Sequence, residues 1–216
     1  MKKSKSIKLN FIMNVILTMS SFIFPLITFP YVSRILLPEG TGKVSFATSL
    51  ISYFSMFAQL GIPTYGIRAC AKVRDDKEEL TRTTQELVII NFVMSVISYT
   101  VLAVALMLVP RLREERALYI IVSLTIAFNV IGMEWMYKAL EQYTYITIRS
   151  IIFKFVALIV MFVFVHQKSD YIFYGAITIL AASGSNIFNF INAHKFIDMR
   201  PVGKYHFKRH FKPIAV

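Results

Sequence analysis

Four long intervals without a single charged side chain constrain this sequence more than any motif does. Residues 9–33, 44–67, 87–110 and 171–193 contain no Lys, Arg, Asp or Glu. A helix needs roughly 20 mainly apolar residues to cross a hydrocarbon core about 30 Å thick. The first interval is too long for the apolar part of a cleavable signal peptide and lacks a small-residue cleavage site near its end. The intervals therefore predict four membrane-spanning helices, the first of them retained.

Two further spans are predicted although each contains charge. The span at 117–137 includes Glu134, but Trp135 and Tyr137 beside it are typical of a membrane interface. The span at 150–167 includes Lys154, which can snorkel to the interface or face a cavity. The whole chain is 56% hydrophobic and only 17% charged, whereas soluble domains carry about 25% charged residues. We therefore predict an all-α integral membrane bundle of six transmembrane helices over residues 1–193, followed by a basic segment at 194–216.

Lysine and arginine are distributed unevenly between the two sides of such a bundle. If the N-terminus is cytoplasmic, 18 of the 24 basic residues fall in cytoplasmic segments. Basic residues accumulate in cytoplasmic loops, so we predict that both termini are cytoplasmic. Juxtamembrane Lys and Arg interact with anionic lipid headgroups. Membrane lipids therefore account for the net charge of +12, and we predict no nucleic-acid partner.

The sequence offers no pattern that indicates catalysis or a cofactor. The single Cys70 excludes an internal disulfide and a CxxC metal site. His206 and His210 are one helical turn apart, but the cations around them favour a basic amphipathic surface segment over a metal site. No Gly-rich phosphate loop occurs. We predict that the chain is not an enzyme and holds no cofactor and no metal.

Three other segments carry specific expectations. Residues 68–87 are highly charged and suit either a helix near the headgroups, continuous with the third span, or a solvated linker. Pro38, Gly40 and Gly42 are expected to end one helix and to allow a tight reversal before the next. Glu134 and Lys138 lie four residues apart. They form either a paired interface anchor or, if Glu134 faces a cavity, part of the mouth of a path for a polar solute.

Residues 29–76, FPYVSRILLPEGTGKVSFATSLISYFSMFAQLGIPTYGIRACAKVRDD, carry a family resemblance. The pattern comprises Pro30-Tyr31, Ser33-Arg34, Leu37-Pro38-Glu39-Gly40, Gly42, Gly61 and Gly66 with Arg68. A second stretch at 132–150, GMEWMYKALEQYTYITIRS, adds a Trp followed by an aromatic residue and a short LEQY turn. Over essentially its whole length the chain resembles bacterial polysaccharide flippases of O-antigen, capsule or exopolysaccharide biosynthesis. Their superfamily includes multidrug and toxin extrusion transporters.

The resemblance implies transport of lipid-linked oligosaccharide repeat units from the inner to the outer leaflet of the bacterial cytoplasmic membrane. The substrate would be a polyprenyl diphosphate that carries several sugars. A cleft lined by cations and amides suits its head group. Candidate lining residues are Arg34, Arg68, Glu134, Arg149, Lys154, Asn186 and Asn189. For the cations the alternative role is to set topology, and for the asparagines it is helix packing. A polysaccharide polymerase and glycosyltransferases are further candidate partners.

Members of this family have two six-helix lobes, whereas this chain supplies one set of six and the start of a seventh span. We therefore expect an amino-terminal lobe of a transporter, cut short, that needs a carboxy-terminal lobe or a second copy to act. Two alternatives remain open, a cation-coupled exporter of drugs or small solutes and a non-transporting membrane scaffold. The first three spans and the sixth contain no Asp or Glu, which disfavours strong cation coupling there.

Overall fold

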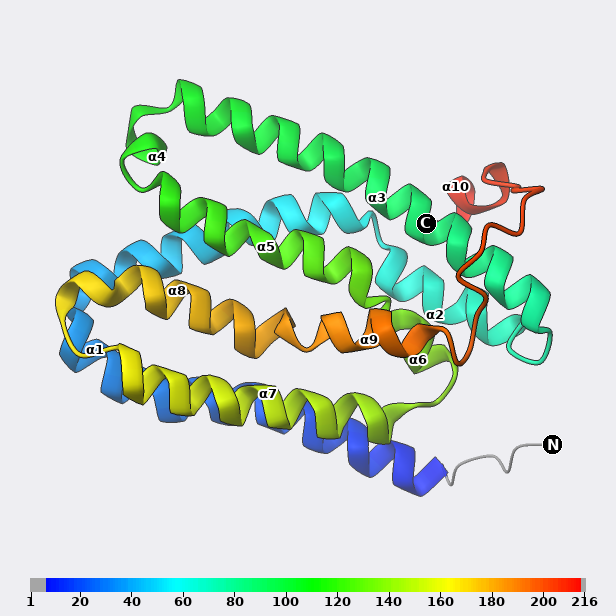
Figure 1. The fold of residues 1–216 in the computed structure, drawn as a ribbon, viewed down its shortest axis with the longest axis horizontal. Helices are drawn as coiled ribbons and strands as arrows, with labels where there is room; N and C mark the ends of the chain where they lie inside the picture. The colour runs from blue at the N-terminus through cyan, green and yellow to red at the C-terminus, as the bar shows by residue number, and fades with distance from the viewer. Residues whose placement is uncertain (1–6, 215–216) are drawn as a thin grey trace. The chain divides into compact units, whose positions relative to one another are not determined.

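The computed structural model describes residues 7–214 of the chain, and no strand occurs among them. Figure 1 shows the order of the helices, coloured along the chain. They are α1 Ile7–Gln59, α2 Ile62–Lys72, α3 Lys77–Leu108, α4 Pro110–Glu114, α5 Arg116–Gly132, α6 Glu134–Ala139, α7 Tyr143–Phe164, α8 Tyr171–Ile179, α9 Asn186–Ala193 and α10 Lys208–Ile214. A 3-10 turn, Lys168–Asp170, precedes α8, and a π-helical turn, Leu180–Gly184, follows it. For the described part of the chain, the all-α prediction is confirmed.

Helix α1 is interrupted at Leu37, which has φ 57° and ψ 176°. Such a backbone cannot continue the helical hydrogen-bond ladder, so α1 consists of two legs, residues 7–36 and 38–59. Pro38 begins the second leg, where its missing N–H costs nothing. The expectation that Gly40 and Gly42 form the reversal is wrong, because both lie in helix after the break.

Within residues 7–214, four stretches are long and apolar enough to cross a membrane. By length and composition they are Ile7–Lys72, Lys77–Leu108, Tyr143–Phe164 and Lys168–Ala193. The first contains both legs of α1, each longer than the roughly 20 residues that a crossing needs. Helix α5 has 17 residues and rises only about 26 Å. The chain therefore has several candidate membrane-spanning helices, and the number six stays a prediction.

Three breaks subdivide the predicted spans and loops. Positive φ values at Leu60 and Gly61 separate α1 from α2, and Met133, with φ 42°, separates α5 from α6. The charged segment after α2 turns at residues 73–76, and Asp76 then caps α3 by accepting hydrogen bonds from the backbone N–H groups of Glu78 and Glu79. Residues 77–87 are therefore continuous with α3, as one of the two alternatives for this segment predicted.

The chain divides into two compact units, each made of segments that are distant in the sequence. The first comprises Met1–Ile51, Glu115–Thr125 and Glu141–Ser185, and the second comprises Ser52–Glu114, Ile126–Leu140 and Asn186–Val216. Each unit thus has its own packing and its own polar contacts.

In the first unit, the first leg of α1 lies along α7 (Figure 1). Tyr31 donates a hydrogen bond to the Val165 carbonyl at 2.9 Å and meets the Phe162 ring edge-on at 4.6 Å between centroids. Thr147 donates to the Met13 carbonyl at 2.9 Å. The buried core of this unit comprises Val32, Leu36, Ala157, Met161, Val165, Ile177 and Ala181. Polar contacts therefore fix the register of two apolar helices whose packing is otherwise non-directional.

Glu115, between α4 and α5, joins three segments of the first unit. Its carboxylate lies 2.8 Å from the Lys43 ammonium and accepts a hydrogen bond from the Tyr171 hydroxyl at 2.7 Å. Partial burial raises the pKa of Glu115, but the hydrogen bonds from Lys43 and Tyr171 lower it further, so the net pKa lies below its usual value. The ionised carboxylate is therefore the form that stabilises this connection.

This lowered pKa predicts an acid-sensitive contribution to stability. Because the folded pKa lies below the unfolded value of about 4.3, the stabilisation is fully present above that value and is lost as the pH falls through the folded pKa. We expect Glu115→Gln to unfold about 2–5 °C below the parent at pH 7. The difference should close on acidification below about pH 4, measured by thermal unfolding in detergent. The exposed neighbour Glu114→Gln is the control, and a pH-independent difference for Glu115→Gln would contradict the assignment.

In the second unit, close backbone approach and polar contacts hold the helices. Gly66 of α2 faces the indole of Trp135 in α6, and a Cβ on Gly66 would lie 2.7 Å from the Trp135 Cε3 atom. Asn91 of α3 donates to the Ala58 carbonyl at 2.7 Å, and Ser98 donates to the Phe54 carbonyl at 3.3 Å. Small residues that admit a neighbouring helix, and polar side chains that bond to its backbone, are typical of helix packing in membranes.

The Gly66 contact predicts that one methyl group disrupts this packing. We expect Gly66→Ala to lower the unfolding temperature by about 3–10 °C, because overpacking typically costs about 1–3 kcal/mol. Gly42→Ala is the matched control, since a Cβ there has no heavy atom within 4 Å. A thiol-reactive fluorophore provides the measurement, because the only cysteine, Cys70, is buried and reacts when the fold opens. Equal melting of the two variants would contradict the close approach.

Candidate functional site

The residues predicted to contact a substrate fall in both compact units. Arg34, Arg149 and Lys154 belong to the first unit, whereas Arg68, Glu134, Asn186 and Asn189 belong to the second. Within each unit their surroundings differ, and a role in substrate contact stays a prediction for all seven.

In the first unit, two cations lie on α7 and are held by polar partners. Arg149 is buried, and its Nη1 donates to the Ser185 carbonyl at 3.0 Å, while the guanidinium lies 5.8 Å from the Tyr145 ring centroid. The Lys154 ammonium donates to the hydroxyls of Ser20 and Ser21, each at 2.8 Å. Arg34 is exposed close to the break in α1. Helix α7 is thus one of the most apolar helices of the chain and nevertheless carries two positively charged side chains.

In the second unit, asparagines from α5 and α9 meet. The Asn186 amide donates to the Asn129 side-chain oxygen at 3.4 Å, and Asn129 donates to the Ser55 hydroxyl at 3.3 Å. Gly132 allows this approach, because a Cβ there would lie 2.5 Å from the Asn186 Cγ atom. Three segments that are distant in the sequence therefore share one polar contact.

Asn189, one turn beyond Asn186, is fully buried. Within residues 7–214, neither its side-chain nitrogen nor its side-chain oxygen has a hydrogen-bond partner. The Tyr137 hydroxyl bonds to the backbone carbonyl of Asn189, leaving the amide group itself unused. A buried polar group without a partner costs about 1–3 kcal/mol and requires an explanation. Asn189 is therefore the strongest amide candidate for a functional contact.

Glu134 forms a salt bridge with Lys138 at 2.8 Å. The pairing predicted from their four-residue spacing is confirmed. This geometry matches the interface-anchor alternative, with Trp135 and Tyr137 buried in the same short helix. A role for Glu134 at the mouth of a solute path stays a prediction.

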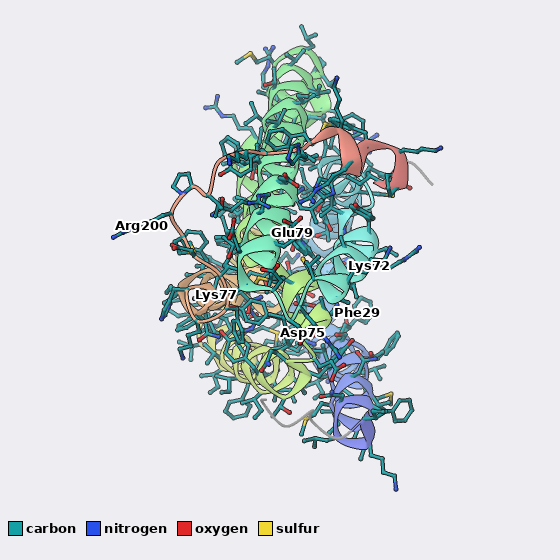
Figure 2. All side chains as sticks on the ribbon, turned by 90° about the vertical axis from the view of Figure 1, so that its right-hand side faces the viewer. Phe29, Lys72, Asp75, Lys77, Glu79 and Arg200 are labelled. Atoms are coloured by element: carbon teal, nitrogen blue, oxygen red, sulfur yellow. The ribbon has the colours of Figure 1, made fainter. Side chains whose placement is uncertain are left out.

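Arg68 lines a cavity of about 800 Å³ within the second unit. Helix α2 supplies one wall and α10 supplies the other. The lining residues are Gly61, Thr64, Tyr65, Arg68, Ala69, Lys72, Val73, Thr83, Arg209, His210, Lys212, Pro213 and Ile214. Four of these are Arg or Lys and none is Asp or Glu. Figure 2 labels Lys72, the last residue of α2, and Lys77 and Glu79 in the first turn of α3.

A buried carboxylate on α3 holds the α10 wall in place. Glu86 has no exposed surface, and it accepts a hydrogen bond from the His206 backbone N–H at 2.6 Å. Arg209 Nε donates to the same carboxylate at 2.9 Å, and the His210 ring lies 2.6 Å from it. The other ring nitrogen of His210 meets the Tyr65 hydroxyl of α2 at 2.8 Å. One buried group thus connects α2, α3 and α10, and His206 and His210 serve this connection.

Among the cations of the cavity, Arg209 is the one that forms salt bridges with the carboxylates of this network. It pairs with Glu79 as well as with Glu86. Partial burial lowers the pKa of Arg209, but the hydrogen bonds that it donates to the Glu79 and Glu86 carboxylates together have the larger, opposite effect, so its pKa lies above the ordinary value. Arg209 is therefore permanently charged, and the Glu79 and Glu86 carboxylates neutralise its charge. Within residues 7–214, the other cations of the cavity have no such carboxylate partner.

Sequence reasoning identified Arg68 but missed the other cavity residues. From the sequence, Lys72 and Lys212 are simply two of the 18 basic residues in predicted cytoplasmic segments, and the segment around His206 and His210 is predicted to be an amphipathic surface element. The available signal was the one-turn spacing of Arg68 and Lys72 on α2. It could not show that α10, about 140 residues later, faces the same side, because that follows from the contacts of α10 with Tyr65, Glu79 and Glu86.

The Glu86 network predicts that removing the charge of Glu86 detaches α10 from α2 and α3. We expect Glu86→Gln to raise tryptic cleavage after Arg200, Lys204 and Lys208 roughly tenfold, since removing one partner of a buried charge pair is strongly destabilising. Glu78→Gln is the control, because the Glu78 side chain is 71% exposed in its pairing with Arg82, and exposed pairs contribute little. Quantitative peptide mapping provides the measurement. Unchanged cleavage in Glu86→Gln would contradict the anchoring role.

Comparison with known proteins places the chain in a family. Residues 7–214 match the family described as "Polysaccharide biosynthesis protein", and the chain therefore belongs to that family. It is 27% identical over 165 residues to a protein of Escherichia coli (strain K12) named "Putative O-antigen transporter", covering 76% of this chain and 40% of that protein. A protein of the same name from Shigella dysenteriae is 25% identical over 153 residues, covering 70% of this chain and 38% of the relative. No solved structure matches the chain.

These relatives agree with the predicted class, a membrane transporter of polysaccharide biosynthesis with several apolar helices. The chain spans about 40% of the length of the curated relatives that it matches. Statements about the whole transporter are therefore proposals.

Proposed function

We propose that the chain is the amino-terminal part of a transporter that moves lipid-linked oligosaccharide repeat units from the inner to the outer leaflet of the bacterial cytoplasmic membrane. The observation that carries this proposal is the family match over residues 7–214, together with the O-antigen transporter names of the relatives. In this role the chain binds and carries a substrate and catalyses no covalent reaction.

The chemistry of the substrate supports the proposal. A polyprenyl diphosphate-linked oligosaccharide has an anionic diphosphate and polar sugars, which are costly to place in hydrocarbon. Arg149 and Lys154 place positive charge on the apolar helix α7, and Asn186 and Asn189 place amides on α9. Cations suit the diphosphate and amides suit sugar hydroxyls, while the polyprenyl tail stays in lipid.

Transport by alternating access requires two halves that move against each other. We infer that this chain supplies one half, and that a carboxy-terminal lobe or a second copy supplies the other. A polysaccharide polymerase and glycosyltransferases, which act on the same lipid-linked material, are the further partners that this function implies.

A chimera tests the proposal directly. The chain would be fused to the remaining carboxy-terminal part of the Escherichia coli relative and expressed in a bacterium that lacks its own O-antigen flippase. We expect the chimera to restore surface polysaccharide and to lower the accumulated lipid-linked repeat units, because both halves of the cleft are then present. The 216-residue chain alone, expressed at the same level, is the comparison.

The outcomes separate the candidate functions. Restoration by the chimera alone supports a half-transporter, and restoration by the 216-residue chain would show that this chain suffices, as two copies. Gradient-driven efflux of cationic dyes without surface polysaccharide would favour a drug or small-solute exporter. Co-purification with glycosyltransferases without either activity would favour a membrane scaffold.

The unused amide of Asn189 provides a residue-level prediction. If its role is substrate contact, Asn189→Ala lowers repeat-unit transport by the chimera at least about fivefold, because a hydrogen-bonding site loses its partner group. Its unfolding temperature should stay equal or rise, since the buried unpaired amide is removed. Asn192→Ala on the same helix is the control. Loss of stability together with retained transport would assign Asn189 to helix packing.

A further inference from the structure

Three cations of the α2–α10 cavity have no carboxylate partner in the part of the chain that the structure describes. Within residues 7–214, Arg68, Lys72 and Lys212 form no salt bridge, whereas Arg209 of the same cavity is paired with Glu79 and Glu86. All three side chains are exposed, and they line the same cavity as a group of like charges. A cavity lined by charges of one sign concentrates the opposite charge, so this cavity favours an anionic ligand.

The geometry brings these cations together from two directions. Arg68 and Lys72 lie four residues apart, on the face of α2 that also presents Thr64 and Tyr65 to the cavity. Residues four apart are neighbours on a helix surface. Lys212 enters from α10, which the buried Glu86 network fixes through Arg209 and His210. The position of Lys212 opposite Arg68 and Lys72 thus depends on the contacts of Arg209 and His210 with Glu86, and not on the three cations themselves.

The lining also defines the kind of anion. Arg presents a planar fork and Lys a compact point charge, and both are used to bind phosphate oxygens. The Thr64 side chain adds a hydroxyl group, whereas Val73, Pro213 and Ile214 supply apolar surface at the same cavity. A volume of about 800 Å³ accommodates more than a bare ion. A phosphate group attached to a larger, partly apolar body fits this combination.

We propose that the α2–α10 cavity is a phosphate-binding site. The phosphate belongs either to the headgroup of an acidic phospholipid or to a soluble phosphate or diphosphate, and the same chemistry recognises both. The apolar lining favours the lipid headgroup. Binding here connects α2 to α10 through a ligand, in addition to the His210 bridge between Tyr65 and Glu86. The inference goes beyond the proposed transport function, because it assigns a ligand class to a cavity of which only Arg68 is among the predicted substrate-binding residues.

The single tryptophan makes the site measurable. Trp135 of α6 packs directly on Gly66. Gly66 belongs to α2, the helix that also supplies Arg68 and Lys72 to the cavity. The full chain would be reconstituted in phosphatidylcholine vesicles that contain a minor fraction of lipid with brominated acyl chains, either phosphatidylglycerol or phosphatidylcholine. Bromine quenches tryptophan at short range. We expect brominated phosphatidylglycerol to quench Trp135 more than brominated phosphatidylcholine does at the same mole fraction.

Two triple variants with the same charge change test the residues. Arg68→Gln/Lys72→Gln/Lys212→Gln removes the unpaired cations, and we expect it to weaken phosphatidylglycerol binding at least about tenfold. Lys195→Gln/Arg200→Gln/Lys204→Gln removes three exposed cations that do not line the cavity, and it should keep the preference. The single variant Lys72→Gln changes an exposed residue at the end of α2. We expect it to cause an intermediate loss of phosphatidylglycerol binding without lowering the stability of the fold. Thermal unfolding of each variant confirms that the fold is retained.

A second arm identifies the source of the phosphate. Inorganic pyrophosphate and orthophosphate would be titrated against the protein in neutral detergent, with the unfolding temperature as the readout. Selective phosphatidylglycerol quenching that depends on the cavity cations assigns a lipid headgroup. Stabilisation by pyrophosphate with the same dependence, but no lipid preference, assigns a soluble phosphate and still supports the site. Equal loss in both triple variants, or no binding of either probe, would overturn it and leave only general attraction of basic residues to anionic membranes.

Discussion

The thickness of the hydrocarbon core is the constraint on which the rest of this structure depends. Helices that cross it must satisfy their backbone polar groups internally. This chain accordingly forms long apolar helices, interrupted at a few non-helical residues. Leu37 divides the 53-residue helix α1, and Met133 separates α5 from α6. Polar side chains inside these helices must also find partners, which is why Asn91 reaches the Ala58 carbonyl and Lys154 reaches Ser20 and Ser21.

Positive charge has three different roles in this chain. Arg149 and Lys154 are held by neutral oxygens on an apolar helix, where charge is costly without function. Lys43 and Arg209 are compensated by carboxylates and connect segments of their own units. Arg68, Lys72 and Lys212 line a cavity without carboxylate partners among residues 7–214. The net charge of +12 is therefore not a uniform membrane-binding property, because each group of cations has its own surroundings.

The sequence predicted the class of fold and part of the candidate site. Charge-free intervals anticipated α3 and the helical stretch from α8 to α9, because composition and length decide whether a helix can lie in lipid. The pairing of Glu134 with Lys138 followed from their spacing on one turn. The sequence predicts the reversal in α1 at Pro38, Gly40 and Gly42, whereas the backbone leaves the helix at Leu37, directly before them. Propensity cannot anticipate a strained residue that its surroundings hold in place. The contacts of Glu86 gave no local signal at all.

By itself, the sequence determined which segments are apolar helices, where basic residues concentrate, and the family to which the chain belongs. These properties are local or cumulative, so they follow from residue order alone. Folding in three dimensions brings α10 back to α2 and places Asn186 against Asn129 at Gly132. It also buries Asn189 with a side-chain amide that has no hydrogen-bond partner within residues 7–214. Such contacts join residues far apart in the chain, and apolar helices with polar groups around them leave many pairings open until packing selects one.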